Sequence, residues 1–351
     1  CVESEHSALT ACVAASATGA RTFTASASAG LALMHEILYV TSGCRAPVVM
    51  AIANRALSAP INIHCDHADS MVERDASWIQ IYVENSQETY DSVIQAFKIA
   101  EDPDILLPVM VMLDAFFLSH TLERINVLPD ENVRKFVGTR KIPLVRGHEG
   151  KLVPFMLNPE NPVTMGPLAL YDYYFEHKRQ QEAAMQRALQ KIKQVHDEYG
   201  EISGRTYGNG LTDPYQLEDA EIATICVGST AGTTKVVVDQ LRAKGVKAGL
   251  LRLRTYRPFP LQDITKALEN VKALAVMDRS HSFGAHGGPI FHEIRHTLYD
   301  AQTHPQVVNY IYGLGGRDMP QTLIHEIYRD LQKIVKTKRV EKPVQFIGVR
   351  E

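Results

Sequence analysis

Apolar runs alternate with segments of helical periodicity along the first third of the chain. Continuous apolar runs at 47–53, 78–83 and 107–113 are bounded by proline or by polar residues, which is typical of strands buried on both faces. Residues 86–100 carry apolar positions at helical spacing between two of these runs. Further elements are expected at 6–19 (helix), 22–25 (strand) and 30–42 (helix). This order predicts a mostly parallel sheet with helices on both sides.

The same alternation returns in the last third of the chain. Strand-like runs occupy 222–227, 248–253, 271–277 and 307–312, and residues 233–244 have helical periodicity. We therefore expect a second parallel unit. The predicted fold class is α/β, with two doubly wound domains. Many unrelated enzymes share this architecture, so it does not identify a function.

The segment between the two units differs from both. Residues 120–165 are polar and contain five prolines, which predicts an irregular connection. Residues 168–200 carry charges of both signs at helical spacing, which favours a solvated helix bridging the two domains. The predicted organisation is a first domain at 1–165, a bridging helix and linker at 166–217, and a second domain at 218–351.

Composition narrows the class of protein. The 351 residues carry a formal charge of -3 and are 45% hydrophobic, so no basic surface indicates nucleic acid or an anionic membrane. No apolar run approaches the roughly 20 residues that span a bilayer, and no signal peptide precedes the first element. We therefore expect a cytoplasmic protein with no membrane partner.

The cysteines are few and scattered. There are five, and no two of them form a C-x-x-C pair. Neither a disulfide framework nor a metal or iron–sulfur site is expected in this chain. If the protein takes part in redox chemistry, its electrons travel through another group.

Three motifs near the N-terminus carry a family resemblance. They are CVESEHSA at 1–8, TFTASASAGLALMHE at 22–36 and ANRALSAP at 53–60. Together they resemble the pyrimidine-binding domain of thiamine-diphosphate enzymes, in particular the alpha subunits of pyruvate:ferredoxin oxidoreductases (pyruvate synthases), in the 2-oxoacid:ferredoxin oxidoreductase family. Residues 257–260 (RPFP) match the same subunits, and the second unit resembles the C-terminal domain of transketolase. The resemblance also implies a preceding segment with a Tyr-Pro-Ile-Thr-Pro type loop, which the given sequence lacks.

The resemblance assigns the catalytic role to Glu5. Thiamine becomes a nucleophile when its own amino group, in the imino form, removes a proton from the thiazolium ring. A carboxylate on the pyrimidine N1′ favours that form. By resemblance Glu5 is this carboxylate and therefore also a cofactor-binding residue. The alternative is that Glu5, or the neighbouring Glu3, is an acidic residue stabilised by the dipole of the helix that follows.

Two further residues are assigned by the same resemblance. Arg55 follows an apolar strand, where open α/β sheets place functional groups, and its guanidinium suits the carboxylate of a 2-oxo acid. The alternative for Arg55 is a structural salt bridge at the strand end. Ser28 is assigned to cofactor binding. It lies in a Ser-Ala-Gly-Leu run where the family usually has Ser-Gln-Gly-Leu.

Two other clusters have a structural interpretation. His64, His67 and Asp69 could be metal ligands, but no fourth ligand is suitably spaced, so a hydrogen-bonded loop is favoured and no metal site is predicted. The run GSTAGTTK at 228–235 lacks the spacing of a phosphate-binding loop and is interpreted as a turn from strand to helix.

The resemblance implies a heteromeric enzyme. This chain would share thiamine diphosphate with a beta subunit that holds the diphosphate and Mg2+, because the metal–diphosphate motif is absent here. Gamma and ferredoxin-like delta subunits would complete the complex, with [4Fe-4S] clusters on the partners, coenzyme A as co-substrate and ferredoxin as acceptor. The resemblance implies pyruvate as the substrate, because the Gly-Pro-Ser-Thr-Gly type run common in the 2-oxoglutarate enzymes is absent. Another 2-oxo acid and a non-catalytic scaffold subunit are the alternatives.

Overall fold

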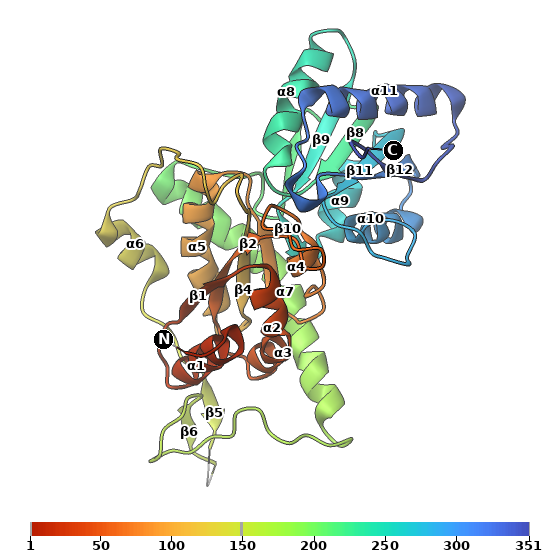
Figure 1. Ribbon diagram of the computed structural model, residues 1–351. Helices are drawn as coiled ribbons and strands as arrows, with labels where there is room; N and C mark the ends of the chain where they lie inside the picture. The colour runs from red at the N-terminus through yellow and green to blue at the C-terminus, as the bar shows by residue number, and fades with distance from the viewer. Residues whose placement is uncertain (1, 148–149, 351) are drawn as a thin grey trace.

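The computed structural model describes residues 2–147 and 150–350 and contains two α/β domains, each built on its own sheet (Figure 1). The first sheet has the order β1-β2-β4-β3-β10. Its strands are β1 (Phe23–Ser26), β2 (Val49–Asn54), β3 (Ile79–Tyr82), β4 (Val109–Asp114) and β10 (Thr255–Arg257). The first four are parallel, and β10 pairs antiparallel with β3. Each strand expected in the first domain is present.

Helices cover both faces of this sheet. The helices before the connecting segment are α1 (Glu5–Ala17), α2 (Ser28–Leu33), α3 (His35–Gly43), α4 (Ala68–Met71) and α5 (Ser86–Ala100). The helix expected at 30–42 is thus divided at Met34 into α2 and α3. One apolar cluster includes Leu9 of α1 and continues into the second domain, and another lies between the sheet and α5.

The connecting segment is more regular than its prolines suggested. It contains α6 (Asp130–Val137) and a two-stranded hairpin, β5 (Leu144–Arg146) paired antiparallel with β6 (Leu152–Pro154). Both strands are edge strands, where proline is tolerated because one side of the strand needs no hydrogen-bond donor. The expectation of an irregular connection was therefore wrong for these elements.

The long charged segment forms α7 (Tyr174–Ser203), but it is solvated on one face only. Its buried residues recur every three or four positions, and they join the apolar cluster of the first domain. They include Ala184, Ala188, Ile192, Val195 and Tyr199. Figure 1 shows α7 running the length of the first domain. The mixed charges occupy the opposite face, which is why the sequence suggested a fully solvated helix.

The second domain has a six-stranded sheet in the order β13-β12-β11-β8-β9-β7. Its strands are β7 (Thr212–Tyr215), β8 (Ile222–Cys226), β9 (Ala248–Leu253), β11 (Ala273–Asp278), β12 (Gln306–Ile311) and β13 (Val344–Phe346). All pairs are parallel except that of β7 with β9. Its helices are α8 (Thr230–Arg242), α9 (Leu261–Ala267), α10 (Pro289–Tyr299), α11 (Gln321–Thr337) and the short 3-10 helix η2 (Leu314–Gly316). The predicted fold class is confirmed.

A buried ion-pair network joins the two domains. Glu88 of α5 accepts from Arg252 Nη1 at 2.6 Å and from Arg254 Nε at 2.8 Å, and all three side chains are fully buried. Strand β10 follows directly and completes the first sheet from the second half of the chain. The two domains are therefore connected by both charge pairing and a shared sheet.

Among the helices of the described ranges, none is long and apolar enough to cross a bilayer.

Candidate functional site

The predicted site residues lie at one edge of the first sheet. Strands β1, β2 and β4 are parallel and in register, so their carboxyl ends meet at the same edge. Ser28 follows β1, Arg55 follows β2, and Asp114 ends β4. In open α/β sheets this edge is where ligands bind.

A buried carboxylate holds this edge together. Asp69 is fully buried, and its Oδ2 accepts the backbone N–H groups of Ser28 and Arg55, both at 2.9 Å. Its Oδ1 accepts from Asn54 Nδ2 at 2.7 Å and from the Ser70 N–H at 2.8 Å. Burial raises the pKa of Asp69 to about 6, and the four donors limit that rise and favour the ionised form. Asp69 thereby fixes Ser28 and Arg55 next to each other.

Ser28 is held at this edge mainly through its backbone N–H. The backbone angle φ of Ser28 is +50°, in a region that residues other than glycine rarely adopt. The hydrogen bond from its N–H to Asp69 stabilises this conformation. The buried hydroxyl donates to the carbonyl oxygen of Ala56. A coenzyme at this edge could therefore meet Ser28 Oγ as an acceptor, since its proton is already used.

Glu5 lies on the same edge and is exposed. It is the first residue of α1, whose N-cap Ser4 accepts from the backbone N–H of Ser7. The side chain of Glu5 lies over Gly30, where an added Cβ would be 2.9 Å from Glu5 Cγ and 2.8 Å from Ser26 Oγ. Glycine at position 30 is thus what leaves room for Glu5 in this position.

The two neighbouring glutamates differ in their partners. The carboxylate of Glu3 accepts from Ser7 Oγ at 2.6 Å, and this bond lowers its pKa. The carboxylate of Glu5 has no hydrogen bond or ion pair within residues 2–147 and 150–350. The alternative of an acidic group at the helix start describes Glu3 well, because the carboxylate of Glu3 is already hydrogen-bonded to a residue of that helix. Glu5 remains available to a ligand.

Arg55 is also available. It is half-buried, and its Nε is buried without a hydrogen-bond partner. In the described part of the chain no carboxylate pairs with its guanidinium, so the alternative of a structural salt bridge has no partner there. A planar cation with an unpaired buried N–H suits a carboxylate ligand.

The suggested metal ligands do not converge. His64 is exposed and its ring lies 4.5 Å from that of Phe116, while His67 Nε2 is 2.8 Å from Asp114 Oδ1. Asp69 is occupied by its four donors. The loop therefore forms the hydrogen-bonded network that the sequence favoured.

A different trio, Cys65, His67 and Asp114, has potential ligand atoms within 4.8 Å of one another. The guanidinium of Arg279 contacts two of these three residues. Its Nη1 donates to Cys65 Sγ at 3.2 Å and to Asp114 Oδ2 at 3.1 Å, so it supplies the positive charge that a metal ion would bring. Burial favours a higher pKa for Asp114, but His67, Arg279 and Ser229 outweigh it and hold the pKa well below its usual range. The guanidinium balances the carboxylate here, so the trio is part of an interdomain ion-pair network.

The glycine turn at 228–235 belongs to the same network. Strand β8 ends at Cys226, α8 begins at Thr230, and Ser229 donates its N–H and its hydroxyl to Asp114 Oδ2 at 3.1 and 2.6 Å. The interpretation as a strand-to-helix turn is confirmed, and the acceptor at this helix start is a carboxylate of the other domain.

Sequence reasoning missed what Asp69, Asp114 and Arg279 do. The sequence shows Asp69 only as a member of the cluster with His64 and His67, because the partners of Asp69, Ser28 and Arg55, lie 41 and 14 positions away. Asp114 is the last residue of the apolar strand β4, and Arg279 directly follows the apolar strand β11. A charged residue at the end of an apolar run was the signal in the sequence.

The comparisons with known proteins fit this geometry. A family model described as pyruvate flavodoxin/ferredoxin oxidoreductase, thiamine diphosphate-binding, matches residues 1–197, and one described as pyruvate:ferredoxin oxidoreductase core domain II matches 220–324. These matches define the class, a ferredoxin-dependent oxidoreductase subunit with a thiamine-diphosphate-binding domain. The chain belongs to the pyruvate flavodoxin/ferredoxin oxidoreductase family, and the resemblance seen in its motifs is confirmed.

Curated relatives agree along nearly the whole chain. The pyruvate synthase subunit PorA of Methanocaldococcus jannaschii is 49% identical over 95% of this chain and 82% of its own length. That of Thermotoga maritima is 45% identical over 100% of this chain and 85% of its own length. The ketoisovalerate oxidoreductase subunit VorA of Pyrococcus abyssi is 42% identical over 99% of this chain and 85% of its own length.

A solved structure shares the fold. The 2-oxoglutarate:ferredoxin oxidoreductase from Magnetococcus marinus, solved with 2-oxoglutarate, coenzyme A and succinyl-CoA bound, has a TM-score of 0.67 at 16% identity. The match covers 94% of this chain, which spans only 57% of that longer chain. A split-gene transketolase described as an inactive beta4 tetramer has a TM-score of 0.51 at 13% identity over 96% of this chain and 83% of that one.

Asp69→Asn should destabilise the first domain. The amide would direct hydrogens at N–H groups that now donate to a carboxylate, so the free energy of unfolding should fall by at least about 2 kcal/mol. Urea unfolding of the full chain measures this, with the exposed Asp75→Asn as control, expected within about 0.5 kcal/mol of the unchanged protein. Equal stability of the two variants would remove Asp69 from its organising role.

Proposed function

We propose that this chain is the alpha subunit of a coenzyme-A-dependent enzyme that decarboxylates pyruvate oxidatively to acetyl-CoA and CO2, or runs the reverse synthesis. The observation that carries the proposal is a pair of groups at one sheet edge, the carboxylate of Glu5 and the Nε of Arg55, that have no partner within residues 2–147 and 150–350. One suits the coenzyme and the other suits the substrate.

The residues at this edge fit the pyrimidine of thiamine diphosphate. The side chain of Glu5 lies against Gly30, where an added Cβ would come within 2.9 Å of Glu5 Cγ, so glycine leaves the carboxylate its place at this edge. Bound thiamine diphosphate would supply a nucleophilic carbon for the keto group and take up the electrons released on decarboxylation. Glu5 would hold a hydrogen bond at the pyrimidine N1′ atom and so favour the imino form of the ring.

Arg55 would hold the substrate. Its backbone N–H is fixed by Asp69, so the side chain projects from a rigid point at the end of β2. A guanidinium binds a carboxylate through two parallel hydrogen bonds and also fixes its plane. The 2-oxo acid would therefore present its keto carbon in one orientation, which lowers the entropic cost of reaction.

Partner subunits would complete the site. Glu5 is exposed in this chain, although a hydrogen bond to a coenzyme is strong only where water is excluded. We propose that a beta subunit covers Glu5 and binds the diphosphate and Mg2+. Gamma and delta subunits with [4Fe-4S] clusters would carry electrons to ferredoxin, and coenzyme A would accept the acetyl group. Curated relatives named as subunits of pyruvate synthase support a heteromeric assembly.

Pyruvate is favoured as the substrate by the names of the relatives. The pyruvate synthase subunits of Methanocaldococcus jannaschii and Thermotoga maritima reach 49% and 45% identity, whereas the ketoisovalerate subunit of Pyrococcus abyssi reaches 42%. The margin is narrow, and ketoisovalerate is therefore the second candidate. It differs from pyruvate by a branched side chain, which a hydrophobic pocket discriminates by only about 1–3 kcal/mol per carbon.

A substrate panel tests the proposed reaction. Native complex purified anaerobically should reduce viologen with pyruvate only when coenzyme A is present, and its kcat/KM for pyruvate should exceed that for ketoisovalerate and 2-oxoglutarate by about tenfold or more. A higher kcat/KM for ketoisovalerate would make ketoisovalerate the substrate and leave the enzyme class unchanged. No rate with any 2-oxo acid, from a complex shown to contain thiamine, would contradict the catalytic assignment.

Glu5→Gln should abolish most turnover while Glu3→Gln should not. Glutamine keeps the size of the side chain but cannot favour the imino form, so kcat should fall by at least about 100-fold. Glu3 is hydrogen-bonded to Ser7, and its replacement is the matched control, with the same chemical change two positions earlier. Both variants are compared by viologen reduction at saturating pyruvate. Near-normal rates for Glu5→Gln would support a scaffold role for this chain.

Arg55→Leu should weaken pyruvate and leave the coenzyme bound. Loss of a charge-assisted pair predicts a KM for pyruvate raised by about 10- to 100-fold, with Arg55→Lys in between, because lysine restores the charge without the planar fork. Thiamine diphosphate bound to each purified variant is measured alongside. Coenzyme loss in both variants would show instead that Arg55 maintains the structure of the edge.

A further inference from the structure

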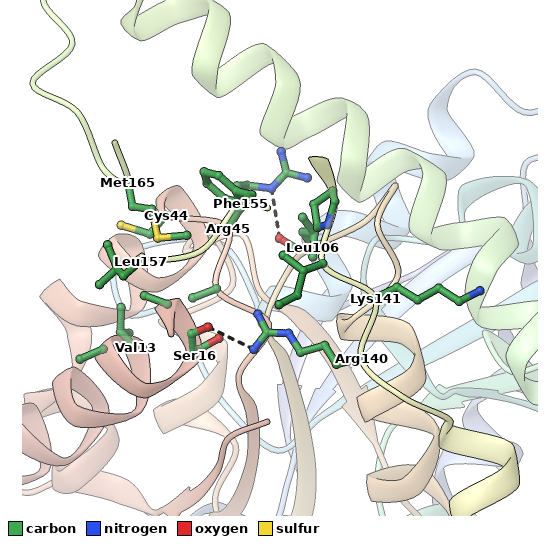
Figure 2. Close-up of a pocket in the computed structure, with 15 residues that line it drawn as sticks. Val13, Ser16, Cys44, Arg45, Leu106, Arg140, Lys141, Phe155, Leu157 and Met165 are labelled. Atoms are coloured by element: carbon green, nitrogen blue, oxygen red, sulfur yellow. Dashed lines mark hydrogen bonds between the residues drawn. The ribbon is translucent and has the colours of Figure 1, made fainter. Parts of the chain in front are cut away.

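A partly enclosed cavity of about 210 Å³ lies at the other end of the first domain. It is bordered by the last turn of α1, the residues that precede β2 and β4, and the base of the β5–β6 hairpin (Figure 2). Arg45 and Ala46 come before β2, whereas Arg55 follows its carboxyl end, so a strand of six residues, about 20 Å, separates the cavity from the candidate active site.

The hairpin segment is anchored firmly over this cavity. The N–H of Leu157 donates to the carbonyl of Ala17 at 2.8 Å. At Gly19 an added Cβ would be 3.0 Å from Ile142, and at Gly166 it would be 2.9 Å from Cys44 Sγ. The walls that come from distant parts of the sequence are therefore packed against each other. The cavity is a defined space between them.

The lining combines hydrocarbon with positive charge. Most of it is apolar, with Val13, Leu106, Phe155 and Leu157 among the larger side chains. Two arginines, Arg45 and Arg140, supply positive charge at the cavity, and no acidic residue is among those that line it. Lys141 also borders the cavity, but its side chain extends away from the other lining residues (Figure 2). Such a lining attracts an anion, and burial of a hydrocarbon chain against it is also favourable.

The two arginines are bound to backbone oxygens and form no ion pair with an acidic residue in the described part of the chain. Arg45 Nε donates to the carbonyl of Leu106 at 3.1 Å, and Arg140 Nη1 donates to that of Ser16 at 3.1 Å. In the ranges that the structure describes, neither guanidinium forms an ion pair. Burial lowers the pKa of both groups. The acidic group that attracts Arg140, Glu101, is paired with Arg21 instead, so within the described residues no ion pair compensates either guanidinium.

A buried hydroxyl provides an independent sign of a ligand. Ser16 is 2% exposed, lines the cavity, and its Oγ has no hydrogen-bond partner. Buried polar atoms almost always have a partner, and an orphan hydroxyl costs about 1–3 kcal/mol. Figure 2 shows Ser16 next to the guanidinium of Arg140. A ligand oxygen placed between them would satisfy both groups.

We propose that this cavity binds a short aliphatic monocarboxylate, with its head between Ser16 and Arg140 and its chain among the apolar side chains. The volume limits the size, because a cavity of about 150 Å³ accepts benzene, so about seven or eight non-hydrogen atoms fit here. The head group is a carboxylate because its oxygens accept hydrogen bonds from a hydroxyl and a guanidinium, and its charge is opposite to that of Arg140. This site is separate from the proposed substrate site and does not depend on it.

Calorimetric titration of the native complex with pentanoate tests the proposal. We expect saturable binding, weaker by about tenfold or more for 1-pentanol, which lacks the charge, and none for pentylamine. Ala17→Leu should fill the space and abolish binding. Ser16→Ala should weaken binding by about threefold to tenfold without lowering the melting temperature, because it removes an unsatisfied hydroxyl. A purely structural Ser16 would not show that combination.

Two controls separate this cavity from other binding. Lys141 extends away from the other lining residues in Figure 2, so Lys141→Gln should leave the affinity within about twofold. Arg55→Leu should also leave it unchanged, since that residue belongs to the opposite edge. Absence of saturable binding, full affinity in Ala17→Leu, or loss of binding in Arg55→Leu would each overturn the proposal.

Discussion

The buried carboxylate of Asp69 is the interaction on which the candidate site depends. It lies in α4 yet binds the backbone at the start of α2 and at the end of β2, so three separate segments meet at one pair of oxygens. Burying a charge is costly unless every lone pair is satisfied, and here four N–H groups do so. This arrangement lets Ser28 keep a positive φ and fixes the point from which Arg55 projects.

The polar groups of the molecule fall into two kinds, and the difference carries functional meaning. At the domain boundary, Asp114 is paired with His67 and Arg279, and Glu88 is paired with Arg252 and Arg254. Their charges are compensated within the chain, as structural networks require. Glu5 and Arg55 instead have no charged partner among the described residues, and a bound coenzyme and substrate would supply one at this edge. The same contrast distinguishes Glu5 from Glu3 two positions earlier.

Elements whose own residues carry a clear apolar pattern could be predicted from sequence, and elements that depend on distant partners could not. The runs at 47–53 and 107–113 become β2 and β4 because a strand buried on both faces is apolar throughout. In α7, charges on the exposed face concealed the buried stripe. Strand β10 was missed because three residues carry no periodicity, and only pairing with β3 makes them a strand. Glu5, Ser28 and Arg55 could be proposed from local motifs, but the carboxylate that organises them becomes visible only in the fold.

The central claim is that Glu5 acts on the pyrimidine of a coenzyme shared with a partner subunit. A structure of the assembled complex with thiamine diphosphate tests it most directly, through the distance between the Glu5 carboxylate and the pyrimidine N1′ atom. We predict hydrogen-bond contact, about 2.6–3.2 Å, with the partner covering the now exposed edge. A pyrimidine bound to a different carboxylate, with Glu5 still facing water, would contradict the account.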